Sequence, residues 1–94
     1  MADLVLDGAT HQVKRAGELI RLTPKEFALL EHFMRRPGRV VTRTMIEDQV
    51  WGYRHDPLTN VVDVYIGRLR QRIHHGHPQP LLHTIRGVGY LLKP

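Results

Sequence analysis

The chain has 94 residues, of which 41% are hydrophobic, enough for one domain with a single modest core. Its formal net charge of +5 favours a polyanionic partner. Cysteine is absent, which excludes disulfides and thiolate metal sites, and serine is absent too, so the two commonest catalytic nucleophiles are missing. We therefore expect no enzymatic activity and no cofactor.

The sequence also bears on the compartment. No apolar run approaches the length of a membrane span, and Met1-Ala2-Asp3 does not begin a signal peptide. We expect a cytoplasmic protein without membrane contact.

The N-terminal stretch, residues 3–22, reads as a small antiparallel sheet of three or four short strands. Leu4 and Leu6 alternate with Val5, and Ala16-Gly17 is a tight-turn signal between two later runs. Charge is not concentrated here. A structural role is predicted for this sheet.

Residues 23–36 are predicted to form the core helix. Thr23-Pro24-Lys25-Glu26 combines an N-cap threonine, a proline at the first helical position and a glutamate at the third, which is a capping box. The helix should end before Arg36-Pro37-Gly38. Its wide apolar face indicates a central position, and is made by Phe27, Leu29, Leu30, Phe33 and Met34.

A second helix is predicted over residues 43–51. Val40-Val41 precedes it as a very short strand, Thr42 is its N-cap, and Trp51-Gly52 ends it. Residues 52–58 then form a loop that is too long for the tight turn of a minimal helix-turn-helix. A loop of this length in so small a domain is often functional.

Residues 59–75 are predicted to form a third helix with two distinct faces. Val62, Ile66, Leu69 and Ile73 recur at helical spacing and require a core. The opposite face begins with aliphatic and aromatic groups and becomes rich in arginine. Such a mixture suits the major groove of DNA, where methyl groups meet thymine and a guanidinium fork meets guanine. A basic face that only meets water fits this stretch equally well.

The chain should close with a β-hairpin over residues 81–92. Gly87-Val88-Gly89 separates its two β-runs and lacks the third glycine and the following helix of a nucleotide-binding loop. Arg86 stands just before the tip, where an extended hairpin could place it beyond the protein's own surface.

The distribution of charge favours the DNA interpretation of the third helix. Arginine outnumbers lysine eleven to three, which suits forked recognition of phosphate or guanine. From residue 59 onward Asp63 is the only acid, whereas the cations are Arg68, Arg70, Arg72, Arg86 and Lys93.

Seven histidines raise a metal hypothesis, above all His74, His75 and His77. Metal sites usually show three or four convergent ligands, and the sequence places no further ligand beside these three. A metal site is therefore not predicted.

Sheet, core helix, second helix, loop, basic third helix and hairpin together make an α+β winged helix-turn-helix. Four motifs in this order resemble the DNA-binding effector domain of OmpR/PhoB-type response regulators, and the resemblance covers the chain after Ala2. The motifs are Leu22-Thr23-Pro24-Lys25-Glu26-Phe27, Val50-Trp51-Gly52, the helix from Asn60-Val61-Val62-Asp63-Val64-Tyr65-Ile66 to Arg68-Leu69-Arg70, and Thr84-Ile85-Arg86-Gly87-Val88-Gly89-Tyr90.

The resemblance implies a role for individual residues. Arg68 occupies the base-contacting position of a recognition helix, Arg72 would meet a phosphate, and Arg86 would enter the adjacent minor groove. Val61, Val64 and Tyr65 would face bases or sugar edges. The positions that relatives use against the phosphate backbone are Arg43, Trp51, Thr84 and Tyr90.

Other positions in the resemblance carry different expectations. Gly67 replaces a basic residue that is frequent there, so one contact would be missing. Arg70 is expected to have a structural role, paired with Asp63. The loop residues that would touch RNA polymerase are Tyr53, Arg54, His55 and Asp56.

The resemblance also implies a larger system. Family members carry an N-terminal receiver domain with a phosphorylated aspartate, which is absent from this chain. Phosphorylation would pair two effector domains on tandem half-sites about one helical turn apart. The isolated domain should be a monomer in solution that pairs on DNA.

Two functions of other classes remain as alternatives. A winged helix with a basic face could dock an acidic protein, and the histidines could serve a metal sensor. Salt-dependent binding to duplex DNA would separate the first alternative from a DNA-binding protein.

Overall fold

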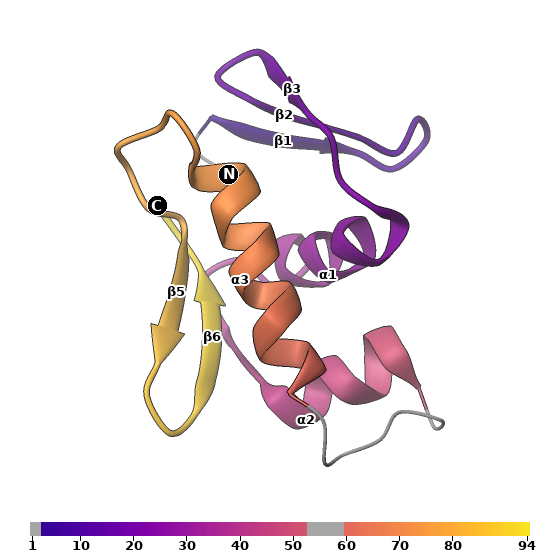
Figure 1. Ribbon diagram of the computed structural model, residues 1–94, viewed down its shortest axis with the longest axis vertical. Helices are drawn as coiled ribbons and strands as arrows, with labels where there is room; N and C mark the ends of the chain where they lie inside the picture. Colours follow the sequence, from indigo (N-terminus) through magenta and orange to yellow (C-terminus); the bar gives the residue numbers. More distant parts are fainter. Residues whose placement is uncertain (1–2, 53–59) are drawn as a thin grey trace.

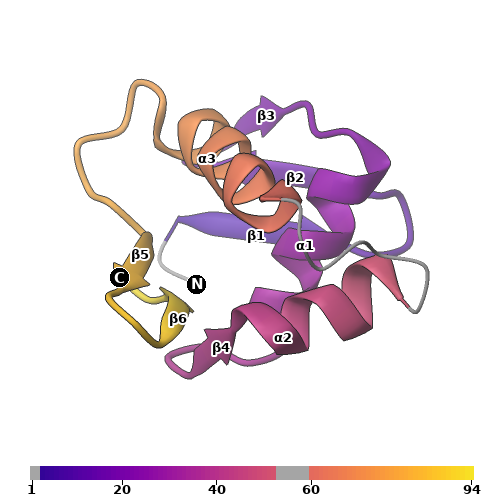
Figure 2. The same ribbon diagram turned by 60° about the horizontal axis from the view of Figure 1, so that its bottom comes forward.

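The computed structural model describes residues 3–52 and 60–94. Helices fill its middle, one small antiparallel sheet lies at one end, and a second sheet packs beside the helices (Figures 1 and 2). This order of elements is that of a winged helix-turn-helix, so the predicted α+β fold class is confirmed. No helix among the described residues has both the length and the apolar character needed to cross a membrane.

The first sheet contains β1 (Leu4–Asp7), β2 (Gln12–Arg15) and β3 (Glu18–Ile20) in that order. Ala16 and Gly17, with φ angles of 53° and 80°, form the predicted two-residue turn between β2 and β3. A turn with two positive φ angles matches the twist of a hairpin, which explains glycine at its second position.

The core helix α1 (Pro24–Met34) begins at the predicted capping box. The Glu26 amide donates to Thr23 Oγ1 at 3.2 Å, and the Thr23 amide donates to Glu26 Oε1 at 2.8 Å. Phe27, Leu30 and Phe33 are buried against the other elements, as their spacing predicts.

The second helix changes its winding halfway. It starts as α2 (Arg43–Ile46), capped by Thr42, and continues as the π-helix η1 (Glu47–Trp51), which closes with a 2.8 Å bond from the Gly52 amide to the Glu47 carbonyl. Such wide turns often occur at functional sites because they redirect the side chains that follow. The sequence pattern predicts a helix here but does not reveal the wide turn.

The third helix α3 (Val61–His74) buries the predicted stripe. Val62, Ile66, Leu69 and Ile73 are each at most 2% exposed. Unlike α1, it begins without a side-chain cap, because the Asn60 side chain makes no capping hydrogen bond and Asp63 in the first turn contacts Arg43 and Tyr90.

The second sheet joins distant parts of the chain in the order β4-β6-β5. The predicted hairpin consists of β5 (Leu82–Ile85) and β6 (Gly89–Leu92), and β4 (Val40–Thr42) pairs with the free side of β6. We call this hairpin the wing. The short strand before α2 was predicted, but its place in the wing sheet was not.

Two side chains fasten the segment between α3 and the wing. Arg15, 1% exposed, donates to the Ile73 carbonyl at 2.5 Å and to the Gln79 carbonyl, and pairs with Asp3. His74 Nε2 accepts the amides of Leu81 and Leu82 at 2.9 and 3.2 Å. The end of α3 and the entry to β5 therefore share one hydrogen-bonded junction.

We predict that glycine is required at position 89 because β4 passes close to its Cα atom. A Cβ atom there would lie 2.3 Å from the Val41 carbonyl oxygen, so β4 and β6 would have to separate. We expect Gly89→Ala to lower the free energy of unfolding by about 1–3 kcal/mol in urea titrations followed by circular dichroism. Gly67→Ala is the matched control, because that helical site is open and alanine should add about 0.5–1 kcal/mol. Equal stabilities of the two variants would contradict this role of Gly89.

The His74 junction predicts a loss of stability in mild acid. Burial and the nearby charges of Arg15, Arg70 and His83 hold the pKa of His74 below its ordinary value of 6.5. The folded protein therefore binds fewer protons than the unfolded chain as pH falls below about 6.5, and its stability falls with pH.

His74→Gln should flatten this pH dependence between pH 7 and 5 in urea titrations. His75→Gln, at an exposed site directly after α3, is the control and should leave the wild-type profile in place. Parallel profiles for His74→Gln and the wild type would rule out titration of His74 as a cause.

Candidate nucleic-acid interface

The outward face of α3 exposes apolar groups and cations in sequence order. Val61 is partly buried, Val64 is 39% exposed, and Tyr65 lies between core and solvent. Arg68 is exposed one turn further on, with its guanidinium carbon 5.2 Å from the centroid of the Tyr65 ring. In the part of the chain that the structure describes, no carboxylate pairs with Arg68. Its donors are available to a ligand.

Arg72 has intramolecular partners that the sequence did not indicate. Its Nε donates to Glu26 Oε2 at 3.0 Å, and another nitrogen donates to the Arg21 carbonyl at 3.3 Å. Glu26 is only 1% exposed, so Arg72 compensates a buried carboxylate and ties α3 to the start of α1. The Arg72 side chain is still 46% exposed. The predicted phosphate contact would use a guanidinium that already serves the fold.

Arg70 has the predicted structural role with a different partner. It donates to the Leu82 carbonyl at 3.2 Å and to Thr84 Oγ1 at 2.7 Å, which attaches α3 to the wing. The expected pair with Asp63 is wrong, because Asp63 lies two turns earlier on α3 and contacts other groups. The sequence shows that Arg70 and Asp63 are charged, but it does not show which wing residue lies beside each of them.

Asp63 is the polar centre between α2, α3 and the wing. Its carboxylate accepts from the Arg43 guanidinium and from the Tyr90 hydroxyl. The Tyr90 hydrogen bond and the Arg43 charge hold the pKa of Asp63 below its ordinary value, whereas burial and the Asp63 hydrogen bond raise the pKa of Tyr90. The stabilisation from Asp63 is present above about pH 4 and lost as pH falls through its lowered pKa. The sequence drew attention to Asp63 as the only acid after residue 59, but it did not indicate Arg43 and Tyr90 as its partners.

Three of the predicted phosphate contacts surround one hollow. Arg43, Thr84 and Tyr90 line a cavity of about 280 Å³ between the start of α2 and the wing. The remaining lining atoms come from the wing turn, which is compact and rich in glycine. The structure thus brings together residues that are far apart in the sequence.

The wing carries its predicted arginine outward. The Val88 amide donates to the Ile85 carbonyl at 3.0 Å and closes the turn, and Arg86 lies exposed within it. Val88 beside it is 54% exposed. The tip therefore presents one cation and one apolar group to solvent.

Trp51 lies at the end of η1 and is partly buried. Its ring meets Tyr65 edge-on, with centroids 5.2 Å apart. The predicted polymerase-contact residues Tyr53, Arg54, His55 and Asp56 lie outside the described residues.

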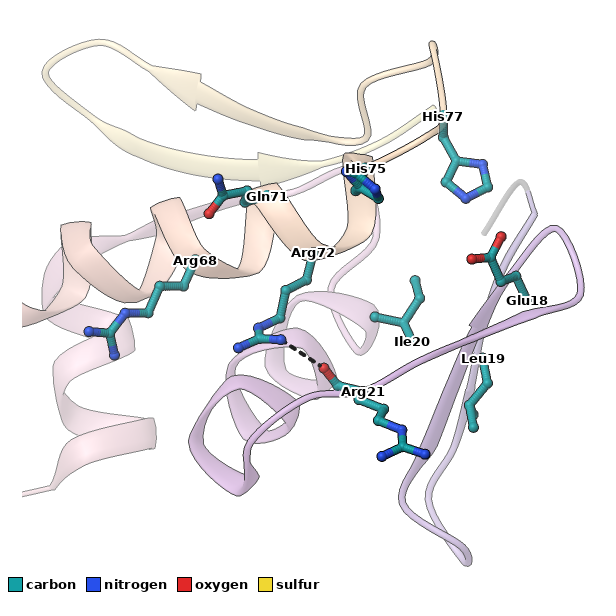
Figure 3. A pocket seen from close by; sticks show the side chains of 9 residues that line it. All are labelled: Glu18, Leu19, Ile20, Arg21, Arg68, Gln71, Arg72, His75 and His77. Carbon is teal, nitrogen blue, oxygen red and sulfur yellow. Dashed lines mark hydrogen bonds between the residues drawn. The ribbon is translucent and has the colours of Figure 1, made fainter.

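A larger groove runs between α3 and β3, with a volume of about 540 Å³ (Figure 3). Arg68 and Arg72 line it from α3, and Arg72 points to the backbone of Arg21. His75 and His77 border its other end, near Glu18. This groove extends the basic surface of α3, and the sequence did not indicate it.

The histidines do not form a metal centre in the described parts of the chain. No group of three or more histidine or acidic side chains there is placed to hold an ion. His74 uses its Nε2 for the wing junction instead.

Known proteins are similar to this chain in both sequence and fold. The family model described as "Transcriptional regulatory protein, C terminal" matches residues 17–92. The chain belongs to this family. It resembles the probable transcriptional regulatory protein TcrX of Mycobacterium tuberculosis, with 46% identity over 94 residues, which are 100% of the chain and 40% of TcrX. With CusR of Escherichia coli K12 it shares 45% over 93 residues, covering 99% of the chain and 41% of CusR.

A solved structure supports the same membership. The DNA-binding domain of Klebsiella pneumoniae RstA, in complex with the RstA box, superposes with a TM-score of 0.86 at 29% identity, covering 98% of this chain and 92% of that one. The chain is thus an OmpR/PhoB-type DNA-binding domain of a transcriptional regulator and not an enzyme. It spans about 40% of the length of the curated relatives.

The Asp63 contacts predict an energetic coupling between α3 and the wing. Asp63→Ala and Tyr90→Phe should each destabilise the protein, and the double variant should lose less than their sum, by about 0.5–1 kcal/mol. The control cycle combines Asp63→Ala with Arg70→Ala, whose guanidinium binds Thr84 instead. That pair should be additive to within about 0.5 kcal/mol in urea titrations. Additivity of Asp63→Ala with Tyr90→Phe would mean that their hydrogen bond contributes nothing in solution.

Proposed function

We propose that the chain binds double-stranded DNA in a sequence-specific manner, with α3 in the major groove and the wing in the adjacent minor groove. The observation that carries this proposal is the outward face of α3, where apolar groups and the exposed guanidinium of Arg68 lie opposite a fully buried stripe. A major groove about 12 Å wide admits such a helix.

Base recognition is assigned to the middle of α3. The Arg68 fork would bind the O6 and N7 acceptors of guanine, and Val61, Val64 and Tyr65 would meet thymine methyl groups or sugar edges. The aliphatic groups precede Arg68 by one or two turns, which spreads the contacts over neighbouring base pairs.

Phosphate contacts are assigned to both sides of α3. The hollow beside the wing is lined by Arg43, Thr84 and Tyr90. Trp51 is the last residue of η1. Arg72 would add a phosphate contact at the C-terminal half of α3. Such contacts set the register of the protein on the duplex, while the bases set the sequence.

The wing contact is assigned to Arg86. Its exposed guanidinium at the hairpin tip suits a narrow, A·T-rich minor groove, whose negative potential attracts arginine. No other cation lies in the wing turn itself, where Gly87 and Val88 follow Arg86.

The surrounding system is proposed from the relatives. One relative is named Response regulator MprA, and the chain spans about 40% of that relative's length. We propose that the chain acts in the cytoplasm with a receiver domain in a two-component phosphorelay, contacts RNA polymerase through residues 53–56, and pairs on tandem half-sites while remaining a monomer in free solution.

Arg68→Ala tests this function. Selection from a random duplex library with the wild type supplies the operator, and fluorescence anisotropy then compares operator with random DNA. Arg68→Ala should reduce the discrimination by about 1–3 kcal/mol. Arg72→Ala should weaken binding to both duplexes alike and lower the slope of log K against log salt by about one.

Lys14→Ala is the matched control for loss of one positive charge, since Lys14 lies on β2 in the sheet far from the wing tip. It should change neither the discrimination nor the salt slope. An absence of duplex binding at low salt would overturn the proposal and favour a protein-docking module. Equal loss on both duplexes for Arg68→Ala would make Arg68 a phosphate contact.

A further inference from the structure

Four side chains from three elements form a continuous row that ends at Arg68. The row runs from the Lys25 ammonium over the Trp51 ring, at 5.4 Å, to the Tyr65 ring and on to the Arg68 guanidinium. It alternates cation, ring, ring and cation. We call these residues, Lys25, Trp51, Tyr65 and Arg68, the cation–ring row.

The far end of the row is anchored in the protein. Lys25, in the first turn of α1, also donates to the Val50 carbonyl at 3.1 Å. The same lysine therefore contacts the backbone and the ring of consecutive residues in η1. Trp51 is the last residue of η1, so its ring is presented from the wide turn rather than from a regular α-helical turn.

The two rings meet in a favourable geometry. Trp51 and Tyr65 have centroids 5.2 Å apart and an interplanar angle of 77°, the edge-to-face arrangement that the charge distribution of aromatic rings prefers. Tyr65 also packs against the buried core. Its ring is thus held both by the core and by Trp51.

Arg68 is the exposed member of the row, whereas Lys25, Trp51 and Tyr65 are partly buried. Residues three apart on a helix share a face, so Tyr65 lies within its reach. A guanidinium over an aromatic ring is attracted to it even when exposed. Ordering a long arginine side chain on binding costs conformational entropy, and a contact that restricts it beforehand reduces this cost.

We propose that Tyr65, supported by Trp51 and Lys25, is a positioning residue that holds Arg68 in a base-reading orientation before DNA arrives. This inference rests on the proposed function. It assigns Tyr65 an action through Arg68, in addition to any direct contact with the duplex. Discrimination at the base pair that Arg68 reads then depends on a ring that need not touch that base pair.

The first measurement uses the free protein and does not require DNA. A guanidinium over a ring face is shielded by the ring current, so the Nε–Hε resonance of Arg68 should lie upfield in ¹H–¹⁵N spectra. Tyr65→Leu should return it to the ordinary arginine position, whereas Tyr65→Phe should leave it shifted. An unshifted resonance in the wild type would overturn the proposal whatever the DNA measurements show.

The second measurement is a double-mutant cycle on DNA discrimination. Tyr65→Leu should lower the ratio of operator to random affinity about two- to fivefold, and Tyr65→Phe should retain most of it. In the Arg68→Ala background, Tyr65→Leu should cause a clearly smaller loss, limited to any direct contact that Tyr65 makes with the duplex. An equal loss in both backgrounds would show a direct contact by Tyr65 and overturn the positioning role.

Two other outcomes, loss of the fold and failure of the proposed function, can be told apart from failure of the positioning role. Thermal unfolding of Tyr65→Leu reports any damage to the core, and Trp51→Phe provides a milder variant that should weaken both the resonance shift and the discrimination. The wild-type protein could show the shifted Arg68 resonance while Arg68→Ala leaves the discrimination intact. Arg68 would then not read a base, and a role of the cation–ring row in recognition would be refuted.

Discussion

Burial of one side of α3 is the constraint on which the rest of the molecule depends. Val62, Ile66, Leu69 and Ile73 commit that side to the core, and α1 and both sheets supply the surfaces that cover it. The opposite side is then exposed by geometry, because side chains at helical spacing cannot change faces. The placement of Val64 and Arg68 toward a ligand follows directly from the placement of the stripe toward the interior.

Glu26 shows how one buried carboxylate connects local and long-range order. One of its oxygens completes the capping box of α1, and the other receives Arg72 from α3. The first contact follows from residues three apart in the sequence, whereas the second spans 46 positions. The buried charge of Glu26 is tolerated because each carboxylate oxygen accepts a hydrogen bond and one of them is paired with a guanidinium.

The difference between those two contacts explains how far the sequence could predict the structure. Periodicity and capping signals operate within one element, so the order of elements, the stripe of α3 and the Thr23 cap were predictable. Partners across elements were not, since the same charges permit several pairings. Asp63 therefore contacts Arg43 and Tyr90 rather than Arg70. In the same way, the sequence did not indicate that Arg15 binds the end of α3 or that β4 pairs with β6. The wide turn of η1 also has no signature in the pattern of apolar residues.

The central position of β6 has a mechanical consequence. Its two sides are both occupied, by β4 and by β5, while β5 has one open edge. The wing can therefore come apart most easily from the β5 side, because separating β6 requires both ladders to break. Since β4 runs straight into the cap of α2, pulling β6 away would also loosen the start of that helix. A force on the wing tip is thus carried to α2 through backbone hydrogen bonds, in parallel with the side-chain contacts that Arg70 and Asp63 make from α3.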